Sequence, residues 1–345
     1  MTKSNEIAIN SELKVPYYKQ IMESIYELME SEKLSVGDLL PSMNELSKNL
    51  NISRETVKKA YNLLREENVI EASQGKGFYL APKKKNKIKI LLLFDKLSTY
   101  KQVLFNSFAA SMRNTSELTI RLHNQDIELF EHFVKVNLNK FDYYLITPHF
   151  PLDAETQARL IKVLRKIPNR KLILLDRNIE ELPGNYGAIY QDFEKDIYEG
   201  LHQAHDLLKK YKTLNVISMK GSLYAPLIEK GVERFCKEKH IKYNFYKTIN
   251  VNRIQKQESF LILNSQLDTE LIELIRAARL RNLKVGEDIG ILSYNESPVN
   301  EIILNGLTVL STDFVQMGEL ASKMIMDNAL DKVKCDFKLL IRNTF

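Results

Sequence analysis

The sequence predicts a multidomain protein with an N-terminal winged helix-turn-helix, mostly α-helical, and a C-terminal two-lobed α/β domain. Residues 17–66 carry apolar side chains at helical spacing, and a glycine-containing hairpin is expected after them. Beyond residue 88, short apolar runs alternate with amphipathic segments, a pattern typical of βαβ units. A lysine-rich stretch separates the two patterns. We therefore expect one domain at 1–80, a basic linker at 81–89 and a second domain at 90–345.

The first domain is expected to hold three helices and a hairpin. Apolar residues at 17, 21, 25, 28 and 29 predict a helix over 17–30 with one buried stripe. Ser42 is followed three residues later by Glu45, the spacing of a capping box, which predicts a second helix over 42–50. Ser53 supplies the cap of a third helix. The β-prone runs 69–72 and 78–80 then predict a hairpin, or wing.

The second helix of a helix-turn-helix pair enters the major groove of DNA through its first residues. Arg54 lies there, and its planar fork suits either a phosphate or a guanine edge. Lys76 lies between two glycines, which allow close approach to the minor groove. Short polar groups at the start of the preceding helix suit phosphate oxygens. The candidate DNA-binding residues are Ser42, Asn44, Ser53, Arg54, Glu55, Thr56, Lys58, Lys59, Gly75, Lys76 and Gly77.

The second domain alternates expected strands and helices. The expected strands are 88–94, 118–123, 143–147, 171–175, 214–219, 260–263, 289–293 and 308–311. The expected helices are 101–113, 126–138, 153–167, 194–211, 225–239 and 268–282. Because parallel neighbours need crossover connections of helical length, this order predicts mainly parallel sheets with helices on both faces.

A cleft between two α/β lobes is the usual place for a small ligand, at the carboxyl ends of parallel strands. Polar residues directly after the expected strands, with nearby aromatic rings, are therefore the candidates for binding an effector. Carboxylates, amides and rings suit a sugar, whose hydroxyls need donors and acceptors and whose C–H faces stack on rings. The candidates are Asp95, Lys96, Tyr100, His149, Asp176, Arg177, Tyr190, Lys220, Tyr224, Asn264 and Asn295.

Composition and motifs exclude several classes of protein. The 50 Lys+Arg against 44 Asp+Glu leave a charge of +6, which permits a polyanionic partner without requiring one. The two cysteines form no Cys-x-x-Cys pair, so a disulfide framework is not expected. We find no metal-binding histidine spacing, nucleophile elbow or nucleotide-binding loop, and expect no metal, no cofactor and no enzyme. The polar N-terminus and short apolar runs predict a cytoplasmic protein that does not enter membranes.

The first domain contains these short motifs: Pro16-Tyr17-Tyr18, Gly37-Asp38-Leu39-Leu40-Pro41-Ser42, Ser53-Arg54-Glu55-Thr56-Val57, Ala60-Tyr61-Asn62-Leu63-Leu64 and Gly75-Lys76-Gly77-Phe78. With them, the stretch from residue 15 to residue 80 resembles the DNA-binding domain of GntR-type bacterial transcription regulators. The resemblance implies binding to double-stranded operator DNA. Where that family commonly places an arginine after the Pro-Ser pair, this chain has Asn44, so a weaker or different contact is expected there.

The second domain contains further short motifs, some of them at or after its expected strands and the last of them near residue 345: Asp176-Arg177, Asn264, 290–295, Leu307-Thr308-Val309, Met317-Gly318 and 340–344. They resemble the LacI-type effector domain, which is similar to periplasmic sugar-binding proteins, and imply that fold with a small-molecule site. Three features depart from that family. Asn295 stands where an aspartate is common, and Ile228 where an arginine often contacts the effector. The stretch 246–260 is too short for a full helix, which predicts a trimmed C-terminal lobe.

The sequence therefore predicts a ligand-responsive bacterial transcription regulator, by default a repressor, that acts as a homodimer. A small molecule, a monosaccharide or a derivative, would close the lobes and change the affinity for the operator. Two alternatives stay open. The C-terminal domain could only dimerise or sense a non-sugar metabolite, or the chain could be an enzyme tethered to nucleic acid. The effector, the operator and the sign of the ligand's effect are not determined by the sequence.

Overall fold

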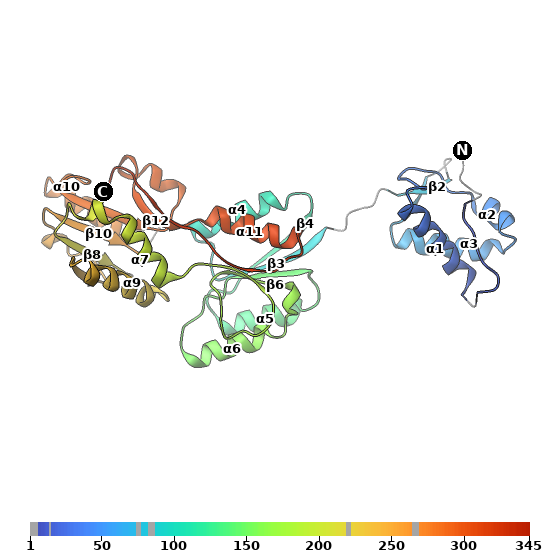
Figure 1. Cartoon of the computed structure of the whole chain (residues 1–345), viewed down its shortest axis with the longest axis horizontal. Coiled ribbons are helices and arrows are strands. Elements are labelled where there is room, and N and C mark those ends of the chain that lie inside the picture. The colour runs from blue at the N-terminus through green and yellow to red at the C-terminus, as the bar shows by residue number, and fades with distance from the viewer. Residues whose placement is uncertain (1–5, 14, 74–76, 82–86, 219–221, 264–268) are drawn as a thin grey trace. The chain divides into compact units, whose positions relative to one another are not determined.

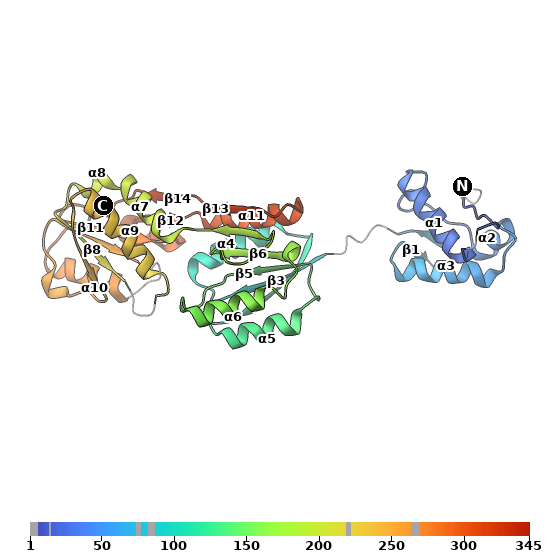
Figure 2. The same cartoon turned by 60° about the horizontal axis from the view of Figure 1, so that its bottom comes forward.

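The computed structural model describes residues 6–13, 15–73, 77–81, 87–218, 222–263 and 269–345. The chain divides into two compact units, residues 1–86 and residues 87–345 (Figures 1 and 2). The described part contains no helix long and apolar enough to cross a membrane.

The first unit is a winged helix-turn-helix, as the sequence predicts. β1 and β2 pair antiparallel with Ile70 opposite Leu80, and Gly37 and Leu40 add backbone hydrogen bonds to the outer edge of β2. Helix α3 packs against both α1 and α2. The elements are α1 (Tyr17–Glu30), α2 (Met43–Asn49), α3 (Arg54–Glu66), β1 (Ile70–Ser73) and β2 (Gly77–Leu80).

Tyr61 fixes helix α3 within this unit. Its side chain is fully buried, and its hydroxyl donates a hydrogen bond of 2.9 Å to the carbonyl oxygen of Pro41, just before α2. Its ring meets the ring of Phe78 edge-on at 4.9 Å between centroids. One side chain thus ties α3 both to the start of α2 and to the wing, so the first turns of α2 and α3 hold a fixed spacing.

The N-terminal lobe of the second unit is a parallel sheet with helices on both faces. The strand order is β13-β7-β6-β5-β3-β4. Figure 1 shows α4 and α11 on one side of the sheet and α5 and α6 on the other. Its elements are β3 (Ile88–Phe94), α4 (Thr99–Ser111), β4 (Ser116–Leu122), α5 (Ile127–Asn137), β5 (Tyr143–Ile146), α6 (Ala154–Leu164), β6 (Leu172–Asp176), β7 (Gly187–Tyr190), α11 (Phe314–Met326) and β13 (Lys332–Lys334).

The C-terminal lobe repeats this layered plan, with the strand order β14-β12-β11-β10-β8-β9 and only the β12–β14 pairing antiparallel among the described pairs. Helices α7 and α9 share one apolar core with the sheet, and α10 belongs to the core on the other face. Its elements are α7 (Phe193–Gln203), α8 (His205–Leu208), β8 (Thr213–Ile217), α9 (Ala225–Glu238), β9 (Lys242–Tyr246), β10 (Glu258–Ile262), α10 (Thr269–Leu280), β11 (Ile289–Tyr294), β12 (Thr308–Thr312) and β14 (Phe337–Leu340).

The structure corrects some of the expected elements. The helix expected over 194–211 is two helices, α7 and α8, because the backbone breaks after Gln203. Strands β7, β9, β13 and β14 were not expected. Between β9 and β10 the described chain forms only a 3-10 turn, η2 (Val251–Arg253), in agreement with the predicted absence of a full helix there. Strand β3 begins at Ile88, inside the stretch assigned to the linker.

Candidate functional site

The first turns of α2 and α3 are built by side-chain caps. Ser42 Oγ accepts a hydrogen bond of 3.2 Å from the backbone N–H of Glu45, whose carboxylate accepts one from the backbone N–H of Ser42 at 3.4 Å. Ser53 Oγ accepts from the backbone N–H of Thr56 at 3.2 Å and also contacts the Thr56 hydroxyl at 2.8 Å. Ser42, Ser53 and Thr56 thus set the start of each helix.

The exposed side chains at these helix starts differ in whether they already have an interaction partner. Arg54 is exposed and has no hydrogen-bond or ion-pair partner within the described ranges, and Asn44 is exposed at the start of α2. Glu55 pairs with Lys58 at 3.4 Å. Lys59 Nζ lies 4.0 Å from the centre of the Tyr18 ring, a cation–π distance. Arg54 is therefore the cation of this surface most available to a polyanion.

The wing carries the other expected DNA contacts. Gly77 begins β2 with a φ of +89°, a conformation that favours glycine. Gly75 and Lys76 lie outside the described residues, so their expected contacts stay predictions.

In the second unit, polar side chains gather where the strands of the N-terminal lobe end. Asp95 follows β3, and its Oδ1 accepts hydrogen bonds from Lys101 Nζ and, at 3.1 Å, from the Thr147 hydroxyl beyond β5. Asp176 ends β6, and its Oδ2 lies 3.0 Å from His149 Nε2 and 4.0 Å from Lys101 Nζ. These side chains are at most 6% exposed, so Lys101 attracts both carboxylates away from water.

The charge pairs decide the protonation of both carboxyl groups. Burial alone would raise the pKa of Asp95 and of Asp176, because it penalises the charged form. The attraction of His149 and Lys101 outweighs burial and holds both pKa values below their usual range. Asp176 has a φ of +72°, an uncommon backbone conformation for a residue other than glycine. Both groups are thus carboxylates at neutral pH, held in one arrangement.

Gln191 connects these buried groups of the N-terminal lobe to the C-terminal lobe by hydrogen bonds. It lies directly after β7, where the chain crosses between lobes, and its Nε2 donates to Asp176 Oδ1. Its Oε1 accepts from the Tyr294 hydroxyl at 3.2 Å and from the Thr312 hydroxyl at 3.0 Å. Strands of both lobes therefore end on one continuous hydrogen-bond network.

Aromatic rings adjoin the network. Tyr224, just before α9, stacks on Phe193 with 4.1 Å between ring centroids and meets the His149 ring edge-on at 5.0 Å. The Tyr224 hydroxyl is buried without a hydrogen-bond partner in the described part, and so is Asn295 Oδ1. We call this set the inter-lobe cluster: Asp95, Lys101, Thr147, His149, Asp176, Gln191, Phe193, Tyr224, Tyr294, Asn295 and Thr312.

Four other expected effector residues lie differently. Lys96 is exposed, and Tyr100 packs its ring against Phe314 at 4.6 Å between centroids. Arg177 donates hydrogen bonds to the carbonyl oxygen of Pro148 at 3.2 Å and to Gln157 at 2.9 Å. Tyr190 packs partly buried against the apolar core of the N-terminal lobe. Lys220 and Asn264 lie outside the described residues, so their roles stay predictions.

Comparison with known proteins places the chain in a family. The profile of bacterial regulatory proteins, gntR family, matches residues 17–80. The HTH-type transcriptional repressor YtrA of Bacillus subtilis (strain 168) is 33% identical over 98 residues, which span 28% of this chain and 72% of that repressor. This chain belongs to the gntR family. The regulator therefore carries the DNA-binding winged helix that its sequence motifs predict.

Solved structures resemble the second unit of the regulator. A lac repressor dimer bound to operator and the anti-inducer ONPF matches 75% of this chain and 94% of its own, with 15% identity and a TM-score of 0.59. A LacI family transcriptional regulator from Lactobacillus casei with bound glucose matches 74% of this chain and 99% of its own, with 13% identity and a TM-score of 0.58. These similarities show that the two-lobed unit has the LacI-type fold.

The selected candidates did not include six residues of the cluster: Lys101, Thr147, Gln191, Phe193, Tyr294 and Thr312. Lys101 lies on α4, where an isolated lysine normally predicts a solvated position. Gln191 and Tyr294 adjoin Tyr190 and Asn295, which were selected. Strand β7 was not expected, and β11 ends at Tyr294, one residue beyond its expected end. His123, after β4, was also missed. It donates from Nε2 to the carbonyl oxygen of Thr147 at 3.1 Å, and burial lowers its pKa to about 4.

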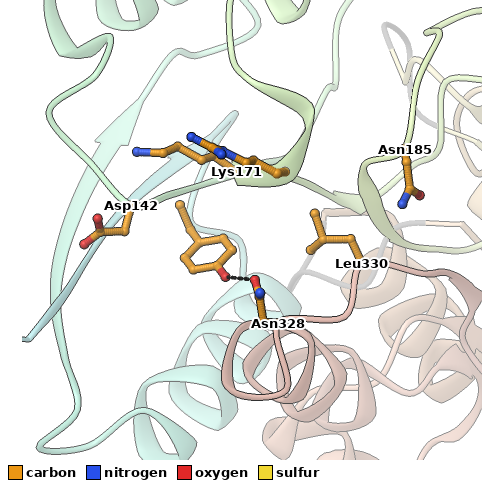
Figure 3. A pocket seen from close by; sticks show the side chains of 7 residues that line it. Asp142, Lys171, Asn185, Asn328 and Leu330 are labelled. Carbon is orange, nitrogen blue, oxygen red and sulfur yellow. Dashed lines mark hydrogen bonds between the residues drawn. The ribbon is translucent and has the colours of Figure 1, made fainter.

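A separate hollow of about 480 Å³ lies at the amino ends of β5, β6 and β7 of the regulator (Figure 3). Tyr143 donates a hydrogen bond of 3.1 Å to Asn328 Oδ1 inside it. This is the end of the sheet opposite to the inter-lobe cluster, and none of the expected effector residues lines it. The lining residues are Asp142, Tyr143, Arg170, Lys171, Asn185, Asn328 and Leu330.

No metal centre is indicated by the geometry of the described residues, because no group of three or more His, Cys, Asp or Glu side chains there could hold an ion.

Proposed function

We propose that this chain is a transcriptional repressor whose hold on operator DNA is controlled by a small molecule bound at the inter-lobe cluster. The observation that carries the proposal is the network through Gln191, which joins buried carboxylate, lysine and histidine groups of one lobe to hydroxyl groups of the other. A ligand that exchanges hydrogen bonds with this network changes the contacts between lobes. It therefore shifts the balance between lobe arrangements by its difference in affinity for them.

A sugar fits the chemistry of the cluster better than an apolar ligand does. The Tyr224 hydroxyl can donate a hydrogen bond, and Asn295 Oδ1 can accept one, and neither has a partner among the described residues. A buried polar atom without a partner costs free energy, which a ligand hydroxyl would recover. The Tyr224 ring adds an apolar face for sugar C–H groups. The glucose in the L. casei regulator of similar fold supports the same class of ligand.

For the DNA-binding unit we propose that the exposed start of α3 enters the major groove, with Arg54 as its principal contact and Asn44 and Lys58 beside it. Ser42, Ser53 and Thr56 form the caps of α2 and α3. Glu55 pairs with Lys58, and Lys59 lies over the Tyr18 ring. The wing, with Gly75, Lys76 and Gly77, is the second contact. The lac repressor dimer on its operator supports two such units acting together, and we propose a homodimer that works in the cytoplasm.

We further propose that the cluster binds its ligand without transforming it. The relatives described above are transcription regulators. The buried carboxylates of Asp95 and Asp176 are held by Lys101 and by the His149 ring, and are therefore engaged within the cluster. Turnover of a bound compound would contradict this proposal.

A thermal-shift screen of the full chain tests the ligand proposal. Monosaccharides, sugar acids and sugar phosphates are added singly, and an effector raises the unfolding temperature because it binds only the folded protein. Asp176→Asn is the matching variant, since asparagine tolerates a positive φ and keeps the size of the side chain while removing the charge.

The expected result is a shift from one class of sugar that the Asp176→Asn protein loses. A shift of equal size in that variant would place the ligand elsewhere. Failure of every sugar would favour the alternative in which the second unit senses another metabolite or only dimerises.

A further inference from the structure

The C-terminal lobe has a second hollow, of about 240 Å³, which is independent of the inter-lobe cluster. It lies beside the 3-10 turn η2, on the face of the sheet that α10 also covers, where the connection from β9 to β10 forms no full helix. The shortened connection therefore leaves a gap over β8, β9 and β10. Its lining shares no residue with the inter-lobe cluster: Asn215, Ile217, Tyr246, Thr248, Ile249, Asn250, Arg253, Ile254, Glu258 and Phe260.

Part of the wall of this hollow is apolar. Ile217 of β8, Phe260 of β10 and Ile254 after η2 are each at most 5% exposed and belong to one core cluster. A dry apolar cavity of about 150 Å³ is enough to hold a benzene ring. The larger hollow here can hold one ring together with polar substituents.

Asn215 places an amide in this apolar wall. It is a residue of the interior strand β8 and only 3% exposed. Its Oδ1 accepts a hydrogen bond of 3.0 Å from Asn244 Nδ2, while its own Nδ2 donates to no residue in the described ranges. Since Asn215 lines the hollow, this N–H group is available to donate a hydrogen bond to a ligand there.

Arg253 supplies a positive charge at the rim. It is exposed and forms no ion pair with any residue that the structure describes. The nearby carboxylate of Glu258 is engaged by the backbone N–H of Gln255 at 2.9 Å. A guanidinium group binds a carboxylate through two parallel hydrogen bonds, which a neutral ligand cannot match.

We propose that this hollow binds a small aromatic carboxylate that carries an oxygen substituent on its ring. The ring packs between Ile217, Ile254 and Phe260. The carboxylate pairs with Arg253, and the ring oxygen accepts the hydrogen bond from Asn215 Nδ2. Such a ligand would make the regulator responsive to a second signal, and the site stands whether or not the inter-lobe cluster binds a sugar.

The test uses the full chain and 3-fluoro-4-hydroxybenzoate, whose binding is followed by fluorine NMR. The neutral comparison compound is 2-fluorophenol, which lacks only the carboxylate. Arg253→Gln removes the rim charge, and Arg279→Gln is its control, because Arg279 is an exposed arginine on α10 of the same lobe. Asn215→Leu removes the buried amide.

The expected result is binding of the benzoate that Arg253→Gln weakens about tenfold or more, while Arg279→Gln does not. The wild-type protein should prefer the benzoate to the phenol, and Arg253→Gln should lose that preference. Asn215→Leu, if folded, should weaken both compounds. No binding of the benzoate to the wild-type protein at millimolar concentration would overturn the proposal. Equal effects of Arg253→Gln and Arg279→Gln would also overturn it, and both of these variants change exposed side chains outside the core.

Discussion

Arg54 is the residue on which DNA recognition by the proposed mechanism depends most. Its guanidinium group stands exposed at the start of α3 and is not committed to another described side chain. We expect Arg54→Ala to weaken operator binding by about 1–3 kcal/mol if the residue reads a base. The measurement is fluorescence anisotropy at fixed salt, with DNA selected from a random pool by the full chain.

Arg65→Ala is the matched control for this change, because Arg65 is an exposed arginine in the last turn of the same helix. Arg65→Ala removes one positive charge from α3, as Arg54→Ala does, but at the opposite end of the helix. We expect a smaller loss that is the same for selected and unselected DNA. Equal losses from the two substitutions would remove Arg54 from the site.

At the scale of single residues, the sequence identifies a member of the inter-lobe cluster where a polar side chain closely follows a buried strand. Asp95, His149 and Asp176 were found in this way. Lys101 could not be, because its burial depends on how α4 packs over the end of β3, and a lone lysine in an amphipathic helix carries no sign of that. The ion pair between Asp95 and Lys101 forms only in the tertiary structure.

Close helix packing gives the prediction at the scale of elements. Gly318 of α11 lies against α4, and a Cβ atom there would be 2.6 Å from the backbone oxygen of Leu104 and 2.8 Å from the backbone nitrogen of Phe108. Backbone atoms cannot move aside cheaply. We expect Gly318→Ala to lower the free energy of unfolding by about 1–3 kcal/mol, as overpacking does, although alanine favours helix.

Thermal denaturation of the full chain measures this effect, with the exposed neighbour Glu319→Ala as the control. The control should unfold close to the wild-type temperature. If both variants unfold at the same temperature, α4 and α11 are not packed as described.

The elements that the sequence predicts best are the buried ones. β3, β5, β6 and β11 are nearly continuous apolar runs, as expected of central parallel strands, and each begins and ends within a residue or two of its expected bounds. The edge strand β9 mixes lysine and asparagine with aromatic residues, the edge strand β13 has a lysine on each side of one valine, and both strands are only partly buried. Their pairing with a neighbouring strand, rather than their own pattern, makes them strands.

At the scale of the whole second unit, polar contacts join the two lobes beside the chain crossings. Lys334 of β13, in the N-terminal lobe, pairs with the buried carboxylate of Asp196 on α7, in the C-terminal lobe. Gln191 joins the same lobes through the inter-lobe cluster. Movement of one lobe against the other must change these contacts. The sequence predicts two lobes from the alternation of strands and helices, but not which side chains bridge them.

The central claim is that a ligand at the inter-lobe cluster controls DNA binding by the other unit. The most direct measurement is the affinity of the full chain for its selected DNA, with and without the sugar found in the thermal-shift screen. We predict that saturating sugar weakens DNA binding by about 5- to 150-fold, the usual range of coupling between two sites, and that Asp176→Asn loses this response. An affinity that is the same with and without a sugar that demonstrably binds would contradict the account.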